Sequence, residues 1–309
     1  MTEPYIQEIL ETIRDCSMDN TYKMAWLKAI VDICHEQNDE FISYDSAAKK
    51  VFSYYWDQTI FFNLRQGPRI QTLPEIITIV NEKIAEYQSK HGTQPIKFIK
   101  VESILDGGSI KKIANVLKKM PGKYFITNGS NPISTYQQVE GGILVKEPNL
   151  IKLYADCLYP AIMYRWAQKL EEVDNSPNLI KKLKGIETGN KLRRGNLKKF
   201  HQFLDYENNN KICFITKKPI SNKVSVDHVI PWSYMFEDKL WNLVYVDSSE
   251  NSSKSNRLPS EKLIIDLEDR NKRLLNLLKQ NNVKHKYVDE LELAIKNDWV
   301  RRFWLGYKN

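Results

Sequence analysis

The chain has 309 residues, of which 42% are hydrophobic, 11% aromatic and 27% charged. These proportions are ordinary for a globular protein, and they exclude a disordered chain, a collagen-like fibre and a repeat array. The 46 Lys and Arg residues outnumber the 38 Asp and Glu residues, and the net charge of +8 is compatible with a nucleic-acid partner without requiring one.

Hydrophobic spacing predicts helices in the N-terminal part of the chain. The apolar residues of Ile6–Ile13 follow the i, i+3, i+4, i+7 spacing of an amphipathic helix. Residues 22–34 are apolar nearly all round, which is typical of a buried helix, and Asn20 and Thr21 can cap it. Further helices are expected over 46–56 and 73–89.

The middle of the chain mixes helix and strand. Residues 109–120 predict a short helix, and Tyr124–Thr127 with Gly142–Val145 predict a short β-hairpin around the turn-rich segment 128–138. A helix is expected over 149–170, before the helix-breaking cluster Asp174–Pro177. We therefore predict a mainly helical recognition or regulatory domain over 1–177 and a second domain over 178–309.

A basic strip, residues 178–201, opens the second domain with eight basic residues against one acid. The basic residues are Lys181, Lys182, Lys184, Lys191, Arg193, Arg194, Lys198 and Lys199. Such a strip predicts contacts with the phosphates of a nucleic acid, which set affinity without reading sequence. A plain solvated face is the alternative. At the far end of the chain, residues 260–309 predict helices whose charged face includes Arg270.

Cysteine usage and the apolar runs indicate a cytoplasmic setting. The four cysteines are scattered without a CxxC pair, which argues against a disulfide framework and for a reducing compartment. Runs such as Ile76–Val80 are far shorter than the ~18 residues of a membrane span, so no membrane partner is expected. Met1–Tyr5 does not begin a signal peptide pattern.

Strand-forming residues gather in one segment of the second domain. Lys211–Thr216 and Lys223–Trp232 predict a β-hairpin around the loop 217–222. After Trp241–Tyr245, the residues Asp247–Ser249 can cap a helix that contains Asn251 and Lys254. The predicted order is strand, strand, helix.

Three short motifs in this segment resemble the HNH nuclease superfamily, whose active site is a ββα-metal fold: Asp227-His228-Val-Ile-Pro, Asn242-Leu-Val and Asn251-Ser-Ser-Lys254. The string 227–259 is similar to restriction-type and phage-defence HNH endonucleases of bacteria. The resemblance covers about 203–259. It implies an α+β protein in which a mostly helical N-terminal domain with a short β-hairpin precedes a ββα-metal core and C-terminal helices.

The resemblance implies a metal-dependent endonuclease that hydrolyses phosphodiester bonds in double-stranded DNA, in a restriction or anti-phage defence system. His228 would activate water, because an imidazole with a pKa near ~6.5 can take a proton at neutral pH. Asp227 and Asn251 would hold one Mg²⁺ or Mn²⁺ ion through oxygen atoms. Asn242 would pin the His228 loop through backbone hydrogen bonds, and Lys254 would contact a phosphate.

The sequence departs from the family where many members carry a zinc knuckle of two CxxC pairs. Here Cys213 is followed by Thr216, and Asp247 and Glu250 replace the second pair. One thiolate cannot build a tetrahedral cysteine-rich site, so no structural zinc is expected. Asp247 and Glu250 are interpreted as acids at a helix N-terminus, with a hard-cation site as the alternative.

Other functions stay open. The protein can be an effector nuclease controlled by a partner protein or a small signal, a homing nuclease, or a DNA-binding protein with an inactive nuclease fold. One HNH site cuts one strand, so a double-strand cut needs a homodimer or sequential nicking. RNA also stays open as a substrate, although no RNA-binding module signature is present.

Overall fold

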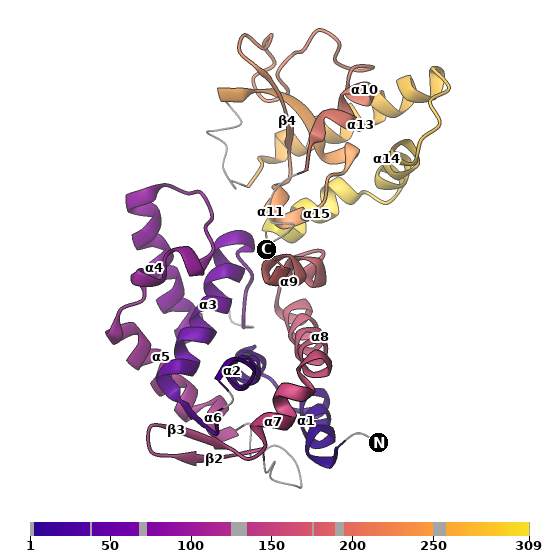
Figure 1. Ribbon diagram of the computed structural model, residues 1–309. Coiled ribbons are helices and arrows are strands. Elements are labelled where there is room, and N and C mark those ends of the chain that lie inside the picture. The colour runs from indigo at the N-terminus through magenta and orange to yellow at the C-terminus, as the bar shows by residue number, and fades with distance from the viewer. Residues whose placement is uncertain are drawn as a thin grey trace. The chain divides into compact units, whose positions relative to one another are not determined.

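The computed structural model describes residues 3–37, 39–67, 73–124, 135–174, 176–188, 195–249 and 258–308. The chain forms two compact units, one of Met1–Asp174 with Leu179–Thr188 and one of Asn175–Asn178 with Gly189–Asn309. Helices predominate in the described residues and accompany small antiparallel sheets, so the protein is α+β as predicted (Figure 1). Within these residues no helix is both long and apolar enough to cross a membrane.

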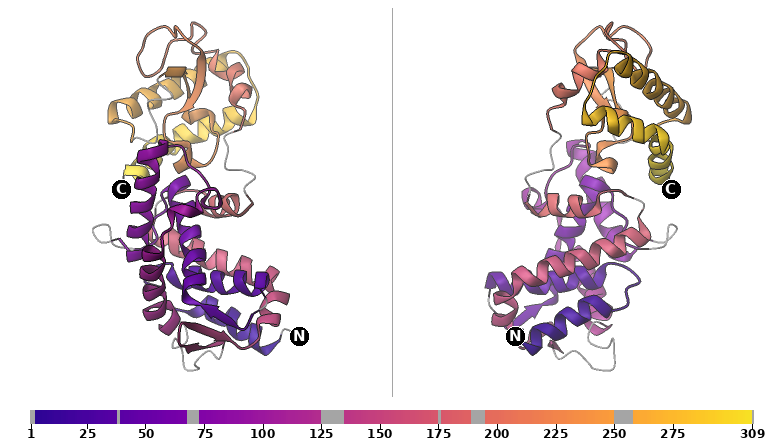
Figure 2. Two further views of the ribbon diagram at one scale, coloured as in Figure 1. Left: turned by 60° about the vertical axis from the view of Figure 1, so that its left-hand side comes forward. Right: turned by 90° about the vertical axis from the view of Figure 1, so that its right-hand side faces the viewer.

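Helices make up most of the first unit. They are α1 (Pro4–Asp15), α2 (Tyr22–Gln37), α3 (Tyr44–Phe62), α4 (Glu75–His91), α5 (Gly107–Lys119), α6 (Pro121–Tyr124), α7 (Pro148–Leu153), α8 (Ala155–Val173) and α9 (Leu179–Thr188), with the 3-10 turns η1 (Phe98–Lys100) and η2 (Glu102–Ile104). The predicted apolar face of α1 is buried, and α2 is buried along most of its length, as an all-round apolar helix must be. Helix α8 lies alongside α1 and α2 (Figure 2).

The predicted helix over 149–170 is two helices in the structure. Tyr154 separates α7 from α8, and α8 ends at Val173, directly before the predicted breaker cluster. The residue Pro148 occupies the first turn of α7, where its missing N–H costs nothing because that group has no partner within the helix.

The first sheet has the strand order β1-β3-β2, with β1 over Phe41–Ser43, β2 over Tyr136–Val139 and β3 over Gly142–Val145. Strand β3 lies where it was predicted, but its hairpin partner does not: the expected strand 124–127 begins with Tyr124, which ends α6, and 125–127 lie outside the described residues. The pairing of Val139 with Gly142 leaves a two-residue turn, and Gly141 has the positive φ of 78° that such a turn requires. The turn therefore lies at 140–141 rather than in the segment 128–138.

The second unit carries the remaining elements. They are η3 (Leu197–Phe200), α10 (His201–Leu204), β4 (Val224–His228), α11 (Trp232–Met235), η4 (Leu240–Asn242), β5 (Leu243–Asp247), α13 (Glu261–Gln280), α14 (Lys286–Lys296) and α15 (Trp299–Lys308). The three last helices were predicted from the leucine spacing of residues 260–309. They pack with β4 and β5 around one apolar core.

The predicted hairpin between 211–216 and 223–232 is wrong. Strand β4 pairs instead with β5, antiparallel, from Val224 opposite Asp247 to His228 opposite Leu243. Segment 211–220 closes on itself as a tight turn, in which the N–H of Cys213 donates to Lys218 O (2.8 Å) and the N–H of Lys217 donates to Cys213 O (2.9 Å). Because this turn uses its own backbone groups locally, they are not available for a ladder with β4.

The charged face predicted for residues 260–309 also needs a correction. Arg270 on α13 is only 1% exposed, and it lies on the same helix face as the buried Leu267 and Leu274. Its spacing of three and four residues from these leucines places it on the core side of the helix. The exposed charged face of α13 is therefore made by other residues, such as Lys262 and Arg273.

Candidate active site

Strand β4 ends at the residue predicted to be the general base. Asp227 and His228 are 3% and 1% exposed, and they pair with Val244 and Leu243 of β5. Strand alternation sends the two side chains to opposite faces of the sheet. The ladder ends at His228 and the chain turns at the next residues, toward Pro231, which precedes α11.

The side chain of Asn242 fixes the backbone that follows His228. Its Oδ1 accepts a hydrogen bond from Ile230 N (2.8 Å), and its Nδ2 donates to Ile230 O (2.9 Å). The carbonyl oxygen of Asn242 also accepts from Val229 N (2.9 Å). Both Asn242 and Ile230 are fully buried, so these bonds replace water for every polar group involved. The structure thus places Asn242 where an organiser of the His228 loop would lie.

The imidazole of His228 makes a contact that the sequence analysis missed. Its Nε2 lies 3.0 Å from Oδ1 of Asp238. Asp238 lies in the loop before η4, four residues ahead of Asn242, and its side chain is 18% exposed. The segment 238–242, called here the clamp, therefore holds both the side chain of His228 and the backbone of the next two residues. The sequence signal for this contact is the acid Asp238 itself, which lies four residues before the Asn242-Leu-Val motif.

Helix α13 holds the clamp and β5 from another side. Arg270 donates through Nη2 to Leu243 O (2.6 Å), and Asn271 donates through Nδ2 to Trp241 O (2.9 Å). Burial lowers the pKa of the Arg270 guanidinium to about 10. Leu243 is the residue opposite His228 in the ladder, so Arg270 supports the strand pairing at the position of the predicted base.

Hydrogen bonds surround Asp247, one of the two acids that stand in place of the second CxxC pair. The carboxylate of Asp247 accepts from Ser249 N (3.0 Å) and Ser249 Oγ (2.8 Å), and from Asn222 Nδ2 (3.1 Å). These bonds hold the pKa of Asp247 well below its usual range, and the bond from the Ser249 N–H has the largest effect. Asp247 thus caps the turn that begins at Ser248, as interpreted from the sequence. Glu250 lies outside the described residues.

Hydrogen bonds also surround the sulfur of Cys213. Burial raises the pKa of this thiol, but the hydroxyl of Thr216 and the backbone N–H groups of Thr216, Asp247 and Ile215 outweigh it, and the pKa is lowered overall. Because the backbone N–H of Asp247 is one of these donors, a hydrogen bond joins the Asp247 position to the sulfur of Cys213.

The predicted metal ligands are only partly described. Asp227 is in β4, whereas Asn251 and the predicted phosphate contact Lys254 lie outside the described residues. Among the residues that the structure describes, no group of three or more His, Cys, Asp or Glu side chains is arranged to hold a metal ion. The donor set of one carboxylate and one amide oxygen nevertheless fits Mg²⁺, which keeps several waters in its coordination shell.

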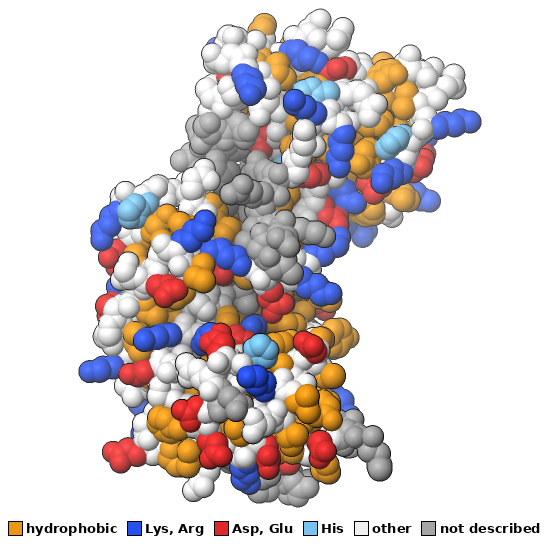
Figure 3. Space-filling model, viewed as in Figure 1, with side chains coloured by type: hydrophobic (Ala, Val, Ile, Leu, Met, Phe, Trp, Pro, Cys, Tyr) orange, Lys and Arg blue, Asp and Glu red, His pale blue; other side chains and the backbone are white. Residues whose placement is uncertain are grey.

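The basic strip is divided between the two units. Lys181 and Lys184 are exposed on α9 in the first unit, and Lys198 and Lys199 are exposed on η3 in the second. Lys182 is fully buried, and burial lowers its pKa to about 7. Its ammonium is therefore not placed to bind a phosphate at the surface. Lys191, Arg193 and Arg194 lie outside the described residues. On the face shown in Figure 3, basic and acidic side chains are interspersed over the first unit.

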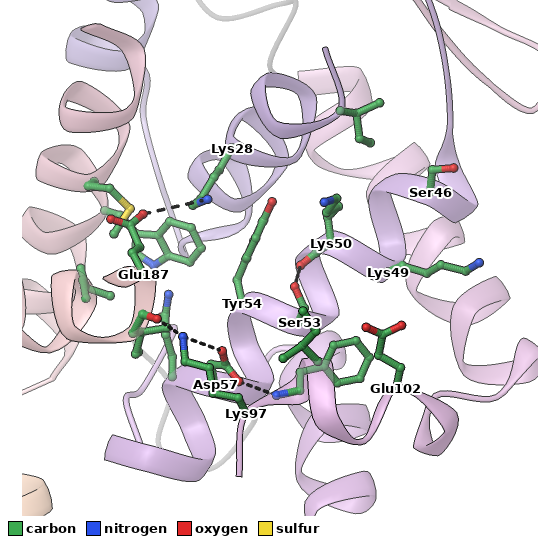
Figure 4. A pocket seen from close by; sticks show the side chains of 18 of the residues that line it. Lys28, Ser46, Lys49, Lys50, Ser53, Tyr54, Asp57, Lys97, Glu102 and Glu187 are labelled. Atoms are coloured by element: carbon green, nitrogen blue, oxygen red, sulfur yellow. Dashed lines mark hydrogen bonds and ion pairs between the residues drawn. The ribbon is translucent and has the colours of Figure 1, made fainter. Parts of the chain in front are cut away.

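A cavity of about 550 Å³, which no sequence motif indicates, lies in the first unit. Apolar side chains, among them Met163, Trp166 and Ile186, line it together with polar ones. The polar lining residues labelled in Figure 4 include Lys28, Tyr54, Asp57, Lys97 and Glu187. Residues from α2, α3, η1, α8 and α9 thus enclose a space of the size that small-molecule sites have.

Two acids of the cavity have ammonium neighbours that are too distant to donate a hydrogen bond. Lys97 Nζ is 3.9 Å from Asp57, and Lys28 Nζ is 4.0 Å from Glu187. Burial raises the pKa of Glu187, and it raises the pKa of Asp57 to about 6 although Phe98 N donates to Asp57 at 2.9 Å. The cavity therefore contains carboxylates that the protein only partly compensates.

Residues 214–260 match the family model described as HNH endonuclease. The match includes both strands of the β4-β5 sheet and the clamp, and it supports placing this segment in the HNH nuclease superfamily, whose members are hydrolases of nucleic acids. The comparison with curated proteins found no match, and neither did the comparison with solved structures.

We expect Asn242→Ala to destabilise the second unit. The substitution leaves the buried N–H and C=O of Ile230 without their side-chain partners, which should lower the free energy of unfolding by about 2–4 kcal/mol. Asn297→Ala is the matched control, because Asn297 Nδ2 donates to Leu293 O (2.9 Å) at an exposed position, where the change should stay below about 0.5 kcal/mol. Urea unfolding measures both, and equal values would contradict the role assigned to Asn242.

Asp57 should make the stability of the first unit depend on pH. Its pKa is about 6 in the folded protein against the ordinary value of 3.8 for an aspartate, so the folded state binds the proton more tightly. The stability gained is therefore fully present below about pH 4 and is lost as the pH rises through 6, up to about 3 kcal/mol in total. Asp57→Asn keeps an acceptor for Phe98 N and should remove this dependence. Unfolding of both proteins between pH 4 and 7 tests it, and parallel curves would contradict it.

Proposed function

We propose that this protein is a metal-dependent HNH endonuclease that cuts double-stranded DNA in a restriction or anti-phage defence system. The observation that carries the proposal is the clamp: Asn242 binds both backbone groups of Ile230, directly after a buried Asp227-His228 pair at the end of a strand. The family match over 214–260 supports the nuclease chemistry independently of this geometry.

His228 would act as the general base. Its ring takes a proton from a water molecule, and the oxygen of that water forms a bond to the phosphorus of the scissile phosphate. The bond from phosphorus to O3′ breaks, and the leaving oxygen takes the electron pair and later a proton from solvent. A positioned histidine typically contributes a factor of about 100 to 10,000 to such a step. The buried clamp would supply the positioning, because it fixes the backbone on which His228 depends.

Asp227 and Asn251 would hold one divalent cation. When bound, a cation of this kind neutralises charge on the phosphate and on the leaving oxygen. Asp227 is only 3% exposed, and a buried carboxylate benefits strongly from a positive partner. Mg²⁺ and Mn²⁺ both accept a set of carboxylate, amide and water oxygens.

DNA contacts would come from Lys254 and the basic strip. Lys181, Lys184, Lys198 and Lys199 have exposed side chains, and Lys191, Arg193 and Arg194 belong to the same stretch of sequence. Lys182 is left out because it is buried. Phosphate contacts of this kind make binding steeply dependent on salt. A double-strand cut would need a homodimer or two successive nicks.

Cleavage of supercoiled plasmid tests the proposed chemistry. Purified protein with Mg²⁺ or Mn²⁺ should nick or linearise the plasmid, and EDTA should stop it. His228→Ala should lower the rate by about 100- to 10,000-fold, because the proton acceptor is lost. His285→Ala is the control, because His285 caps α14 through Nδ1 (Tyr287 N, 3.2 Å) and should keep its activity. Equal cutting by wild type and His228→Ala would refute His228 as the base, and tight DNA binding without cleavage would indicate an inactive nuclease fold.

The cavity in the first unit favours a second candidate function, a nuclease controlled by a small signal. Its size, its aromatic wall and its partly compensated acids suit an organic ligand that offers hydrogen-bond donors. In this case the helical unit would be regulatory rather than a DNA reader.

Filling the cavity distinguishes the two candidates. Ser53 lines it and donates through Oγ to Lys50 O (2.7 Å), whereas Ser89 makes the same kind of bond to Glu86 O (2.8 Å) on an exposed part of α4. If a small signal controls cutting, a protein-free cell extract should stimulate wild type and Ser89→Trp but not Ser53→Trp. Full cutting by wild type without any addition would instead support a stand-alone enzyme.

A further inference from the structure

The contact between His228 and Asp238 is sheltered from water. The side chains are 1% and 18% exposed, and Nε2 lies 3.0 Å from Oδ1. A hydrogen bond between a ring nitrogen and a carboxylate is charge-assisted, and reduced contact with water strengthens it. This hydrogen bond is made by the imidazole ring of His228 itself, the ring proposed to be the base.

The loop that carries Asp238 is anchored on both sides. Lys239, the next residue, pairs with Glu290 of α14 (3.2 Å), and its carbonyl oxygen accepts from Asn242 N (2.9 Å). The second oxygen of Asp238 lies close to Gly195, where an added Cβ would come within 3.3 Å of it. The backbone next to Asp238 is therefore held by contacts with α14 and with Asn242.

The chemistry of the two groups decides which ring nitrogen carries the proton. A carboxylate only accepts hydrogen bonds, so Nε2 must be the donor, and in a neutral imidazole the lone pair then belongs to Nδ1. We propose that Asp238 is a positioning residue that fixes His228 in the Nε2–H tautomer, so that the role of base falls to Nδ1, an atom that is itself buried. This inference rests on the proposed nuclease function. Once Nδ1 has gained its proton, the adjacent carboxylate also stabilises the imidazolium.

Nitrogen NMR of the wild-type protein tests the tautomer without any cleavage assay. In protein labelled with ¹⁵N-histidine, the ring signals of His228 are identified by their loss in His228→Ala. At a pH where the ring is neutral, the proton should be on Nε2. In Asp238→Ala the two tautomers should become mixed. A wild-type ring with its proton on Nδ1, or a spectrum unchanged in Asp238→Ala, would overturn the proposal.

Cleavage kinetics provide the second readout. Asp238→Ala should lower kcat by about 10- to 100-fold, less than loss of the base itself, with little change in KM. Glu290→Ala is the matched control, because it removes one of the two carboxylate partners of Lys239 in the same loop, the other being Glu237 (3.4 Å), and leaves the Asp238 carboxylate in place. Its kcat should stay near that of wild type. Equal losses in the two variants would mean that general loosening of the loop is responsible, and would overturn the positioning role.

The two readouts separate failure of this inference from failure of the proposed function. If wild type cuts no nucleic acid but its His228 ring shows the Nε2–H tautomer, the nuclease function fails and the Asp238 contact stands. If wild type cuts and Asp238→Ala cuts equally well with an unchanged ring spectrum, the nuclease function stands and this inference fails.

Discussion

The two hydrogen bonds between the Asn242 side chain and the backbone of Ile230 set the geometry of the whole candidate site. Both residues are fully buried, so neither bond has a substitute in water. They tie the end of β4 to the turn before β5, and that turn also brings Asp238 to the ring of His228. Arg270 and Asn271 then fix Leu243 and Trp241 from α13. A catalytic histidine on a strand end needs such support, because a loose backbone would not hold the ring in one orientation.

The two units have different relations to this chemistry. The second unit contains β4, β5, the clamp and the helices that support them, and the family match lies entirely within it. The first unit is mostly helical and contains a cavity whose acids are only partly compensated. A cavity of this kind costs stability, since its walls lose packing contacts, and a bound ligand would offset that cost. Under the proposed function, catalysis would lie in the second unit and recognition or control in the first.

Local patterns predicted most of the helices and none of the strand pairings seen in the described residues. The apolar spacing of α1, the all-round apolar character of α2 and the breaker cluster after α8 are properties of short stretches of sequence, and the structure follows them. The hairpin expected from 211–216 failed because β-rich composition does not reveal a partner, and Cys213 and Lys218 bond to each other instead. Arg270 was assigned to a charged face by its residue type, whereas its spacing from Leu267 and Leu274 would have placed it in the core.

Motif spacing along the chain is enough to single out Asp227, His228 and Asn242 as residues of the proposed site, because the order of residues is a local property. Which groups meet depends on the folded chain: Asp238 reaches His228, Lys182 is buried, and helices from distant parts of the chain line the cavity. These outcomes depend on which elements pack together, and packing is decided by burial and hydrogen bonding across the whole unit rather than by neighbours in sequence.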